Sequence, residues 1–292
     1  MRSSNPVFSR RFRDNGYAGF NATPQAGTAA QGNPYAGTAG NPYAQPTNPY
    51  AANPYAQGGP DLQQGAPPQA PARPGVMTMD DVVARTGMTL GTVVVTAVLA
   101  WVADLPVGLG FGAALIAMVL GLVQSFKAKP VPALILAYAA FEGLFLGVIS
   151  KAYNHYADGA PMQAVLGTMA VSAGVLIAYK TRLIRVDRRF YRFVMAAAIG
   201  FLLLMVVNMV AALAGGGDGL GLRSGWLGIG VGVIGVLLGA AFLAMDFKQI
   251  EDGVHYGAPR EIAWMAAFGL TLSLVWIYLE MLRLVSLLNG ND

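Results

Sequence analysis

The 292-residue sequence contains no cysteine, only two histidines and few charged residues. The absence of cysteine excludes disulfides, thiolate metal sites, iron–sulfur clusters and a cysteine nucleophile. Charged residues make up 12% of the chain and hydrophobic residues 55%, whereas an ordinary soluble domain carries about 25% charged residues. This much apolar sequence with so little charge predicts an all-α polytopic membrane protein.

The first 79 residues lack the apolar side chains that a folded core needs. Val7 and Leu62 are the only large aliphatic residues up to Gly75, and the same stretch holds 12 of the 17 prolines. Four Asn-Pro-Tyr-Ala repeats occur there at uneven spacing, beginning at Asn33, Asn41, Asn48 and Asn53. This composition predicts a disordered N-terminal tail over residues 1–79. The tail is either a solvated spacer or a segment that recruits a protein partner, and its basic start suits anionic lipid headgroups.

Seven apolar stretches within residues 80–292 are long enough to cross a bilayer, which needs about 20 residues. Strand-like alternation is absent, so we expect helices over residues 86–103, 105–126, 131–150, 159–179, 193–213, 224–245 and 262–288. Proline is tolerated at helix ends, and every proline outside the tail falls at a boundary between these spans: Pro106, Pro130, Pro132, Pro161 and Pro259. The sequence therefore predicts a seven-transmembrane-helix bundle.

The basic residues predict how the bundle is oriented. Of the 19 Lys and Arg residues, 16 lie in the tail or in the connections on its side of the membrane. Because cytoplasmic loops carry an excess of Lys and Arg, we predict a multi-pass plasma-membrane protein with a cytoplasmic N-terminus and an external C-terminus. Topology then accounts for the net charge of +4, and no nucleic-acid partner is expected.

Glycine spacing within the spans predicts where helices approach closely. Small residues four apart let helix backbones come together in a membrane. Pairs of this kind in the third and sixth spans are Gly143 with Gly147, Gly228 with Gly232, and Gly235 with Gly239. We expect these pairs to lie at helix–helix contacts.

Four ionisable side chains remain within the spans, where charge is expensive and marks function by default. Helical rise places Glu142 about 17 Å into the third span, near the midplane, so it is either protonated or faces water or another helix. Asp246 is expected at the cytoplasmic edge of the sixth span, as a functional carboxylate or a solvated helix end. Glu280 and Arg283 have the i, i+3 spacing of a local ion pair.

Signatures of catalysis are missing from the sequence. It has no H-E-x-x-H motif and no phosphate-binding loop. The seventh span has no lysine for a Schiff base, and His155 and His255 fall in predicted loops on opposite sides of the membrane. We therefore expect neither an enzyme nor a resident cofactor, with Asp246 as the one candidate metal ligand.

Three motifs resemble the Bax inhibitor-1 family: FEGLFLGVIS at 141–150, AMDFKQI at 244–250 and YLEMLR at 278–283. The resemblance covers Met79 to Leu288, and the long polar head is similar to that of the family's actinobacterial branch. It implies a bundle whose seventh helix is central and surrounded by the other six. It also implies a pH-sensitive calcium leak, so that a calcium ion would be a transported species.

The resemblance implies a gate of two aspartates, on helices six and seven, which share a proton, with a basic latch at the end of helix two. Asp246 matches the helix-six aspartate, and Lys127 is the nearest latch candidate. The chain departs from the family at Ser273, which stands where the second aspartate is expected. One aspartate and a serine make a poorer calcium site than two carboxylates, because calcium prefers several oxygen ligands with carboxylates among them.

Two main hypotheses follow. The first is a calcium or other cation leak, gated by protonation of Asp246 and passing Glu142, which helical rise places about 15 Å away in depth. The second is a non-transporting regulatory protein, whose tail recruits partners and whose bundle modulates membrane proteolysis or envelope machinery. Deleting residues 1–75 discriminates between them, since flux survives under the first hypothesis and partner capture is lost under the second. A proton-coupled solute transporter ranks third because the two halves show no internal symmetry.

Overall fold

The structure, a computed structural model, describes residues 75–215 and 219–290. Seven helices in this part of the chain are long and apolar enough to cross a membrane, which confirms the predicted seven-helix membrane protein. A 3-10 turn, η1 (Arg260–Ile262), precedes the last of them. The helices are α2 (Met79–Val102), α3 (Val107–Phe126), α4 (Pro132–Tyr156), α5 (Ala160–Lys180), α6 (Arg188–Gly215), α7 (Gly225–His255) and α8 (Ala263–Asn289). Residues 1–74 of the predicted tail lie outside the described residues. Residues 75–79 are described, and Met79 begins α2, so the predicted end of the tail at residue 79 is too late.

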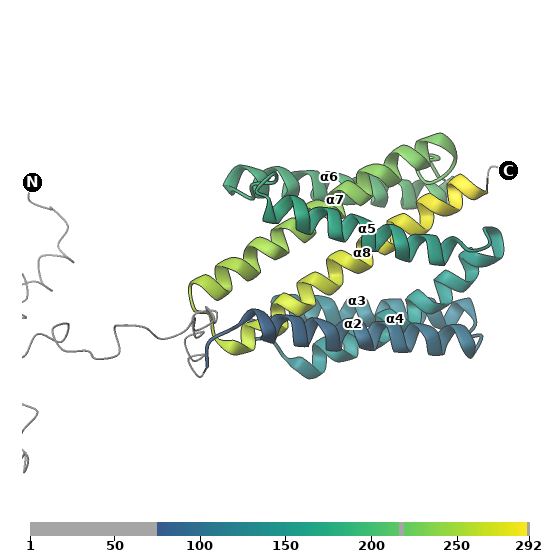
Figure 1. Ribbon diagram of the computed structural model, residues 1–292. Coiled ribbons are helices and arrows are strands. Elements are labelled where there is room, and N and C mark those ends of the chain that lie inside the picture. Colours follow the sequence, from purple (N-terminus) through teal and green to yellow (C-terminus); the bar gives the residue numbers. More distant parts are fainter. Residues whose placement is uncertain (1–74, 216–218, 291–292) are drawn as a thin grey trace, which may run out of the picture. The chain divides into compact units, whose positions relative to one another are not determined.

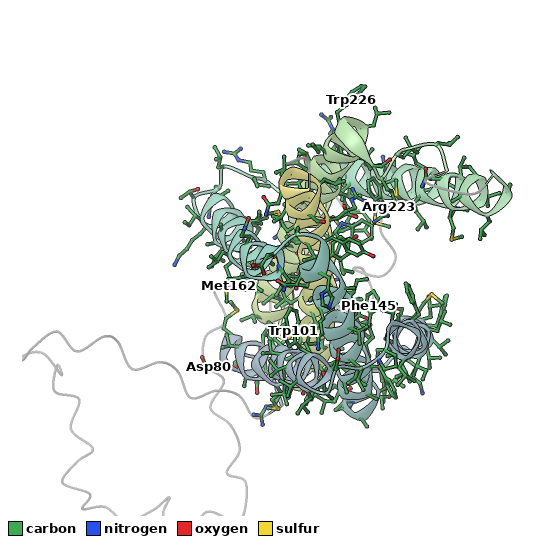
Figure 2. All side chains as sticks on the ribbon, turned by 90° about the vertical axis from the view of Figure 1, so that its right-hand side faces the viewer. Asp80, Trp101, Phe145, Met162, Arg223 and Trp226 are labelled. Atoms are coloured by element: carbon green, nitrogen blue, oxygen red, sulfur yellow. The ribbon has the colours of Figure 1, made fainter. Side chains whose placement is uncertain are left out.

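The last helix, α8, is the centre of the bundle, as predicted (Figures 1 and 2). Its backbone packs against α2, α4, α5 and α7. Side chains connect it to the other two helices: Phe268 packs with Ala117 of α3, and the rings of Trp276 and Phe201 of α6 have centroids 5.7 Å apart. Polar groups on α8 therefore lie in the interior of the bundle.

Glycine pairs lie at two of the tightest helix contacts, which confirms the expectation from their spacing. On α4, a Cβ at Gly147 would lie 2.9 Å from the Cβ of Ala100 on α2. On α7, a Cβ at Gly235 would lie 2.8 Å from the side chain of Glu280 on α8. Glycine at these positions lets α2 pack on α4 and α7 on α8 without displacing backbone.

Most helix ends agree with the predicted boundaries. Pro106 is the N-cap of α3, Pro132 is the first residue of α4, Pro161 lies in the first turn of α5, and Pro259 is the N-cap of η1. At each of these positions the missing N–H removes no helical hydrogen bond. The first span begins seven residues earlier than expected, at Met79, because Thr78 caps α2.

The predicted end of the sixth span at residue 245 is wrong. Helix α7 continues to His255, and its added turns are polar rather than apolar. Lys248 and Asp252 form an ion pair there at 2.6 Å, four residues apart, which supports a helix. The longer α7 also contains His255, in its last turn. His155 lies in the last turn of α4, so neither histidine is in a loop as predicted.

Candidate functional site: a carboxylate facing the central helix

The site begins with a hydrogen bond between α7 and α8. The Ser273 hydroxyl donates to Asp246 Oδ2 at 2.5 Å. One turn earlier on α8 is Gly269, where an added Cβ would lie 3.0 Å from Asp246 Oδ1. A side chain at residue 269 would therefore crowd the carboxylate. The structure brings together the two positions that the family resemblance matched to the aspartate pair.

Asp246 lies deeper in the bundle than the sequence suggested. It is nine residues before the end of α7, which is about 14 Å at the helical rise of 1.5 Å per residue. Ser273 is ten residues after the start of α8, or about 15 Å. Both residues therefore lie well inside their helices, and the half-buried carboxylate of Asp246 is not at a helix end.

Glu142 is level with this pair, and the predicted depth difference of about 15 Å is wrong. The rings of Tyr138 and Phe268 pack edge to face with centroids 5.2 Å apart, which aligns α4 with α8. Glu142 follows Tyr138 by one turn, about 6 Å, and Ser273 follows Phe268 by about 7.5 Å. The error came from ending α7 at residue 245. Glu142 and Asp246 approach α8 from different helices at one depth.

Lys127 is not brought to Asp246. It is the C-cap of α3, and its side chain is exposed. Among the described residues it forms no ion pair, and the one side chain hydrogen-bonded to Asp246 is Ser273. A latch on Asp246 by Lys127 is absent from this conformation.

Glu280 and Arg283 form a salt bridge on α8, with Arg283 Nη2 2.9 Å from Glu280 Oε2. Only 7% of Glu280 and 3% of Arg283 are exposed. Glycines of α7 make room for the pair, since an added Cβ at Gly232 would lie 3.3 Å from Arg283 Nη2. None of the three Arg283 nitrogens makes a well-aligned hydrogen bond with a described residue. The pair is therefore a buried charge cluster with unused donors.

Two further polar contacts of α8 were missed by sequence reasoning. The hydroxyls of Thr271 and Thr89, on α2, are 2.9 Å apart, and those of Tyr278 and Ser150, on α4, are 2.6 Å apart. Each joins the central helix to a different neighbour. The signal in the sequence was the set of hydroxyl side chains on an otherwise apolar α8, which needs partners in a membrane interior.

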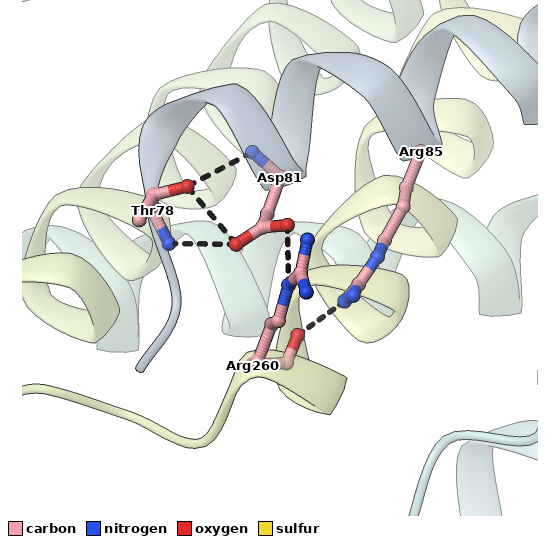
Figure 3. Close-up of polar contacts among 4 residues, drawn as sticks. All are labelled: Thr78, Asp81, Arg85 and Arg260. Atoms are coloured by element: carbon pink, nitrogen blue, oxygen red, sulfur yellow. Dashed lines mark hydrogen bonds and ion pairs between the residues drawn. The ribbon is translucent and has the colours of Figure 1, made fainter. Parts of the chain in front are cut away.

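A polar junction ties the start of α2 to the connection between α7 and α8 (Figure 3). Thr78 and Asp81 form a capping box, and Asp81 Oδ1 accepts from Arg260 Nε at 2.7 Å. Arg85 donates to the Arg260 carbonyl and lies over the Trp264 ring. We call these contacts the α2 junction. The T-x-x-D pattern before an apolar run was a readable signal for it.

The segment just before α2 also pairs with the α7–α8 connection. Val76 and Pro259 form an antiparallel bridge. The Met77 N–H donates to the Ala258 carbonyl at 2.8 Å, and the Arg260 N–H donates to the Gly75 carbonyl at 2.9 Å. The residues that follow the tail are therefore attached to the loop that connects α7 to the central helix.

A second ion pair lies at the opposite end of the bundle. Lys151 Nζ is 2.6 Å from Asp104 Oδ1 and also donates to the Trp101 carbonyl at 3.1 Å. The hydrogen bond and the positive charge of Lys151 hold the pKa of Asp104 below its ordinary value. The carboxylate is solvent-exposed, so this contact joins α4 to the end of α2 without a buried charge.

The described residues contain no group of three or more His, Asp or Glu side chains arranged to hold a metal ion. Asp246 has one hydroxyl beside it, and Glu142 has no hydrogen bond to a described residue. Calcium sites use six to eight oxygens, more than the described side chains bring together around Asp246.

The apolar helices and the central polar α8 define a multi-pass integral membrane protein built as a seven-helix bundle. A family model described as Bax inhibitor 1 like matches residues 5–290. The chain belongs to the Bax inhibitor-1 family. No curated protein matches the sequence significantly.

Proposed function

We propose that the protein is a cation leak of the plasma membrane, gated where α7 meets the central helix. The observation that carries the proposal is the hydrogen bond from Ser273 on the central helix to Asp246 inside α7. A carboxylate in a membrane interior is costly, and such residues mark ion pathways. Calcium is the transported ion that the family membership suggests, and carboxylate oxygen is its preferred ligand type.

The gate works by competition for one carboxyl group. In the closed arrangement Asp246 Oδ2 accepts from Ser273, which holds α7 against α8. Asp246 Oδ1 faces Gly269 and has no hydrogen-bond partner among the described residues. When α7 separates from α8, the freed carboxylate lines the path and attracts a cation. Protonation removes that charge, so Asp246 makes the flux depend on pH.

Glu142 supplies a second carboxyl group at the same depth, on α4. It is half-buried and follows by one turn Tyr138, whose ring packs on Phe268 of the central helix. The proposal assigns it to the wall of the path. Glu142→Gln is expected to lower flux while leaving the pH dependence carried by Asp246.

Calcium-dye flux into proteoliposomes tests the proposal. Wild type, Asp246→Asn and Glu142→Gln are compared across pH, with Asp252→Asn as the matched control on α7. We expect Asp246→Asn to lower flux and flatten its pH profile, and Asp252→Asn to retain both. Wild-type flux in both Asp246→Asn and Glu142→Gln contradicts the proposal.

One observation favours a regulatory role for the tail beside the leak. The segment 75–77 pairs with the loop before α8, so a partner that pulls on the tail also pulls on α7 and α8. The candidate function is partner recruitment through the Asn-Pro-Tyr-Ala repeats. Deletion of residues 1–74 is expected to preserve flux and to abolish capture of tail-binding partners. Loss of flux on deletion would instead assign the tail to the leak itself.

A further inference from the structure

A long groove runs between α2 and α5, away from the Asp246 site. Its first part has a volume of about 1240 Å³ and is bordered by the start of α2, the end of α5 and the last turns of α7. Its second part, of about 690 Å³, is bordered by the rest of α2 and the start of α5. Leu270, Leu274 and Tyr278 line the groove from α8, at a spacing of four residues. The lining faces of α2, α5 and α8 continue from one part to the next, and from this continuity we infer that the two parts form one groove.

The second part of the groove is lined mainly by apolar side chains. Trp101 of α2 and Met162 of α5, labelled in Figure 2, stand on its two walls. The polar groups in this part are already used: the Ser150 and Tyr278 hydroxyls bond to each other, and Ser172 donates to a backbone carbonyl of its own helix. This part therefore suits a hydrocarbon chain.

The first part of the groove is basic at its mouth. Lys180, Arg182 and Arg185 lie at or after the end of α5 and line this mouth. Among the described residues none of the three forms a salt bridge. Lys248 and Glu251 also line it: Lys248 lies 2.6 Å from Asp252 and 4.0 Å from Glu251, and Glu251 accepts from the Tyr179 hydroxyl. Four basic side chains and one acidic side chain line this part, so the end of the groove is positively charged.

Arg182 occupies a backbone conformation that glycine normally provides. Its φ is +58°, and its N–H donates to the Tyr179 carbonyl at 3.0 Å to close α5. Glycine is the usual residue at such a left-handed helix end, because other residues are strained there. An arginine at this position is unfavourable for the backbone. A role for its charged side chain at the mouth of the groove would account for its presence there.

We propose that the groove between α2 and α5 is a binding site for one anionic phospholipid. The acyl chains lie along the α8 stripe of Leu270 and Leu274, and the headgroup phosphate lies among Lys180, Arg182 and Arg185. Basic pockets between transmembrane helices bind acidic headgroups in this way. The groove extends along α2 from Met79 to Trp101, about 33 Å at helical rise. That is longer than the ~15 Å from headgroup to midplane.

The charge arm of the test counts bound lipid by native mass spectrometry of the full chain, titrated with phosphatidylglycerol or with phosphatidylcholine. Arg182→Gly/Arg185→Gln removes two charges from the mouth. It is compared with Arg189→Gln/Arg192→Gln, which removes two exposed charges outside the groove. At about fivefold per basic residue, the first double variant is expected to bind phosphatidylglycerol about 25-fold more weakly. The second is expected to bind it as wild type does.

Folding does not confound this comparison, because glycine suits the backbone at residue 182. The thermal stability of the Arg182→Gly single variant is expected to equal or exceed that of wild type. Equal losses of phosphatidylglycerol in the two double variants would overturn the proposal, since the effect would then be general surface charge. Equal binding of phosphatidylcholine and phosphatidylglycerol by wild type would overturn it as well.

A second part of the test concerns the acyl chains, and it places a large side chain from α2 in the groove. Gly87 lines the groove, and a Cβ there meets nothing within 4 Å. Gly91, one turn further, has equally open surroundings but lines neither part. Gly87→Trp is expected to reduce phosphatidylglycerol binding at least tenfold, and Gly91→Trp to leave it unchanged. The same loss in both variants would place the lipid elsewhere.

A competition arm separates a bound lipid from a bound phosphate ion. Inorganic phosphate or glycerol phosphate, added in tenfold excess over phosphatidylglycerol, is expected to leave the lipid bound, because neither has an acyl chain. Displacement by inorganic phosphate alone would overturn the lipid assignment. None of the three arms measures ion flux, so their outcome is independent of the leak proposed above.

Discussion

The buried Glu280–Arg283 pair gives a quantitative prediction about stability. The two side chains are 7% and 3% exposed, and Arg283 has no well-aligned hydrogen bond to a described residue. Glu280→Gln therefore leaves a buried guanidinium without its counter-charge. Breaking a buried pair from one side typically costs about 3–5 kcal/mol. We expect a loss of that size from Glu280→Gln alone and a similar loss from Arg283→Met alone.

Removing both charges has a different expected result. Replacing a buried ion pair by uncharged groups of similar volume is often neutral. The Glu280→Gln/Arg283→Met double variant is thus expected to lie within about 1 kcal/mol of wild type. The two single losses then fail to add, with a coupling energy of about 5 kcal/mol or more in magnitude.

Reversible unfolding in mixed detergent micelles measures the four members of this cycle. The exposed pair of Lys248 and Asp252, at 38% and 42% side-chain exposure, is the control. Asp252→Asn is expected to cost about 0–1 kcal/mol, because exposed pairs contribute little. Single losses at the buried pair no larger than this control would refute the reasoning, as would a double variant whose loss equals the sum.

Three further outcomes are expected. Gly143→Ala is expected to destabilise the bundle by about 1–3 kcal/mol, because its Cβ would overlap α2 backbone; Gly112→Ala, with open surroundings, is expected to be neutral or stabilising in the same melts. Asp81→Asn is expected to speed amide exchange in residues 75–78 and 256–262, which its ion pair and cap hold together, and unchanged exchange there would contradict this. In NMR titrations, Lys151→Met is expected to raise the pKa of Asp104 toward the ordinary value for an aspartate. In wild type the pKa of Asp104 is lowered. The stabilisation from the Lys151–Asp104 contact is therefore fully present at pH values above the ordinary aspartate pKa and is lost as the pH falls through the lowered pKa.

The number and places of the helices could be predicted because they depend on local sequence. Apolar length sets a span, and proline sets an end. The end of α7 was missed because hydropathy stops at Asp246 while the helix does not. The pairing of Lys248 with Asp252 at i, i+4 is a helical signal, and weighing it would have placed Asp246 inside the helix.

The site was only partly predictable. Aligning the seventh span placed Ser273 opposite Asp246 by resemblance, and the hydrogen bond between them agrees with that alignment. The depth of Glu142 depended on α7 and was wrong for the same reason. The groove between α2 and α5 could not be predicted, since it arises from how three helices pack and leaves no local pattern in any one of them.

The central claim is that the Ser273 hydroxyl holds the gate closed on Asp246. Calcium-dye flux of Ser273→Ala, beside Asp246→Asn and the same-helix control Ser286→Ala, tests it most directly. A hydrogen bond to a charged group contributes about 1.5–3 kcal/mol, so its loss is expected to raise flux roughly tenfold or more. Asp246→Asn is expected to lower flux, and Ser286→Ala to leave it unchanged. Flux in Ser273→Ala that is equal to or below that of wild type would contradict the account.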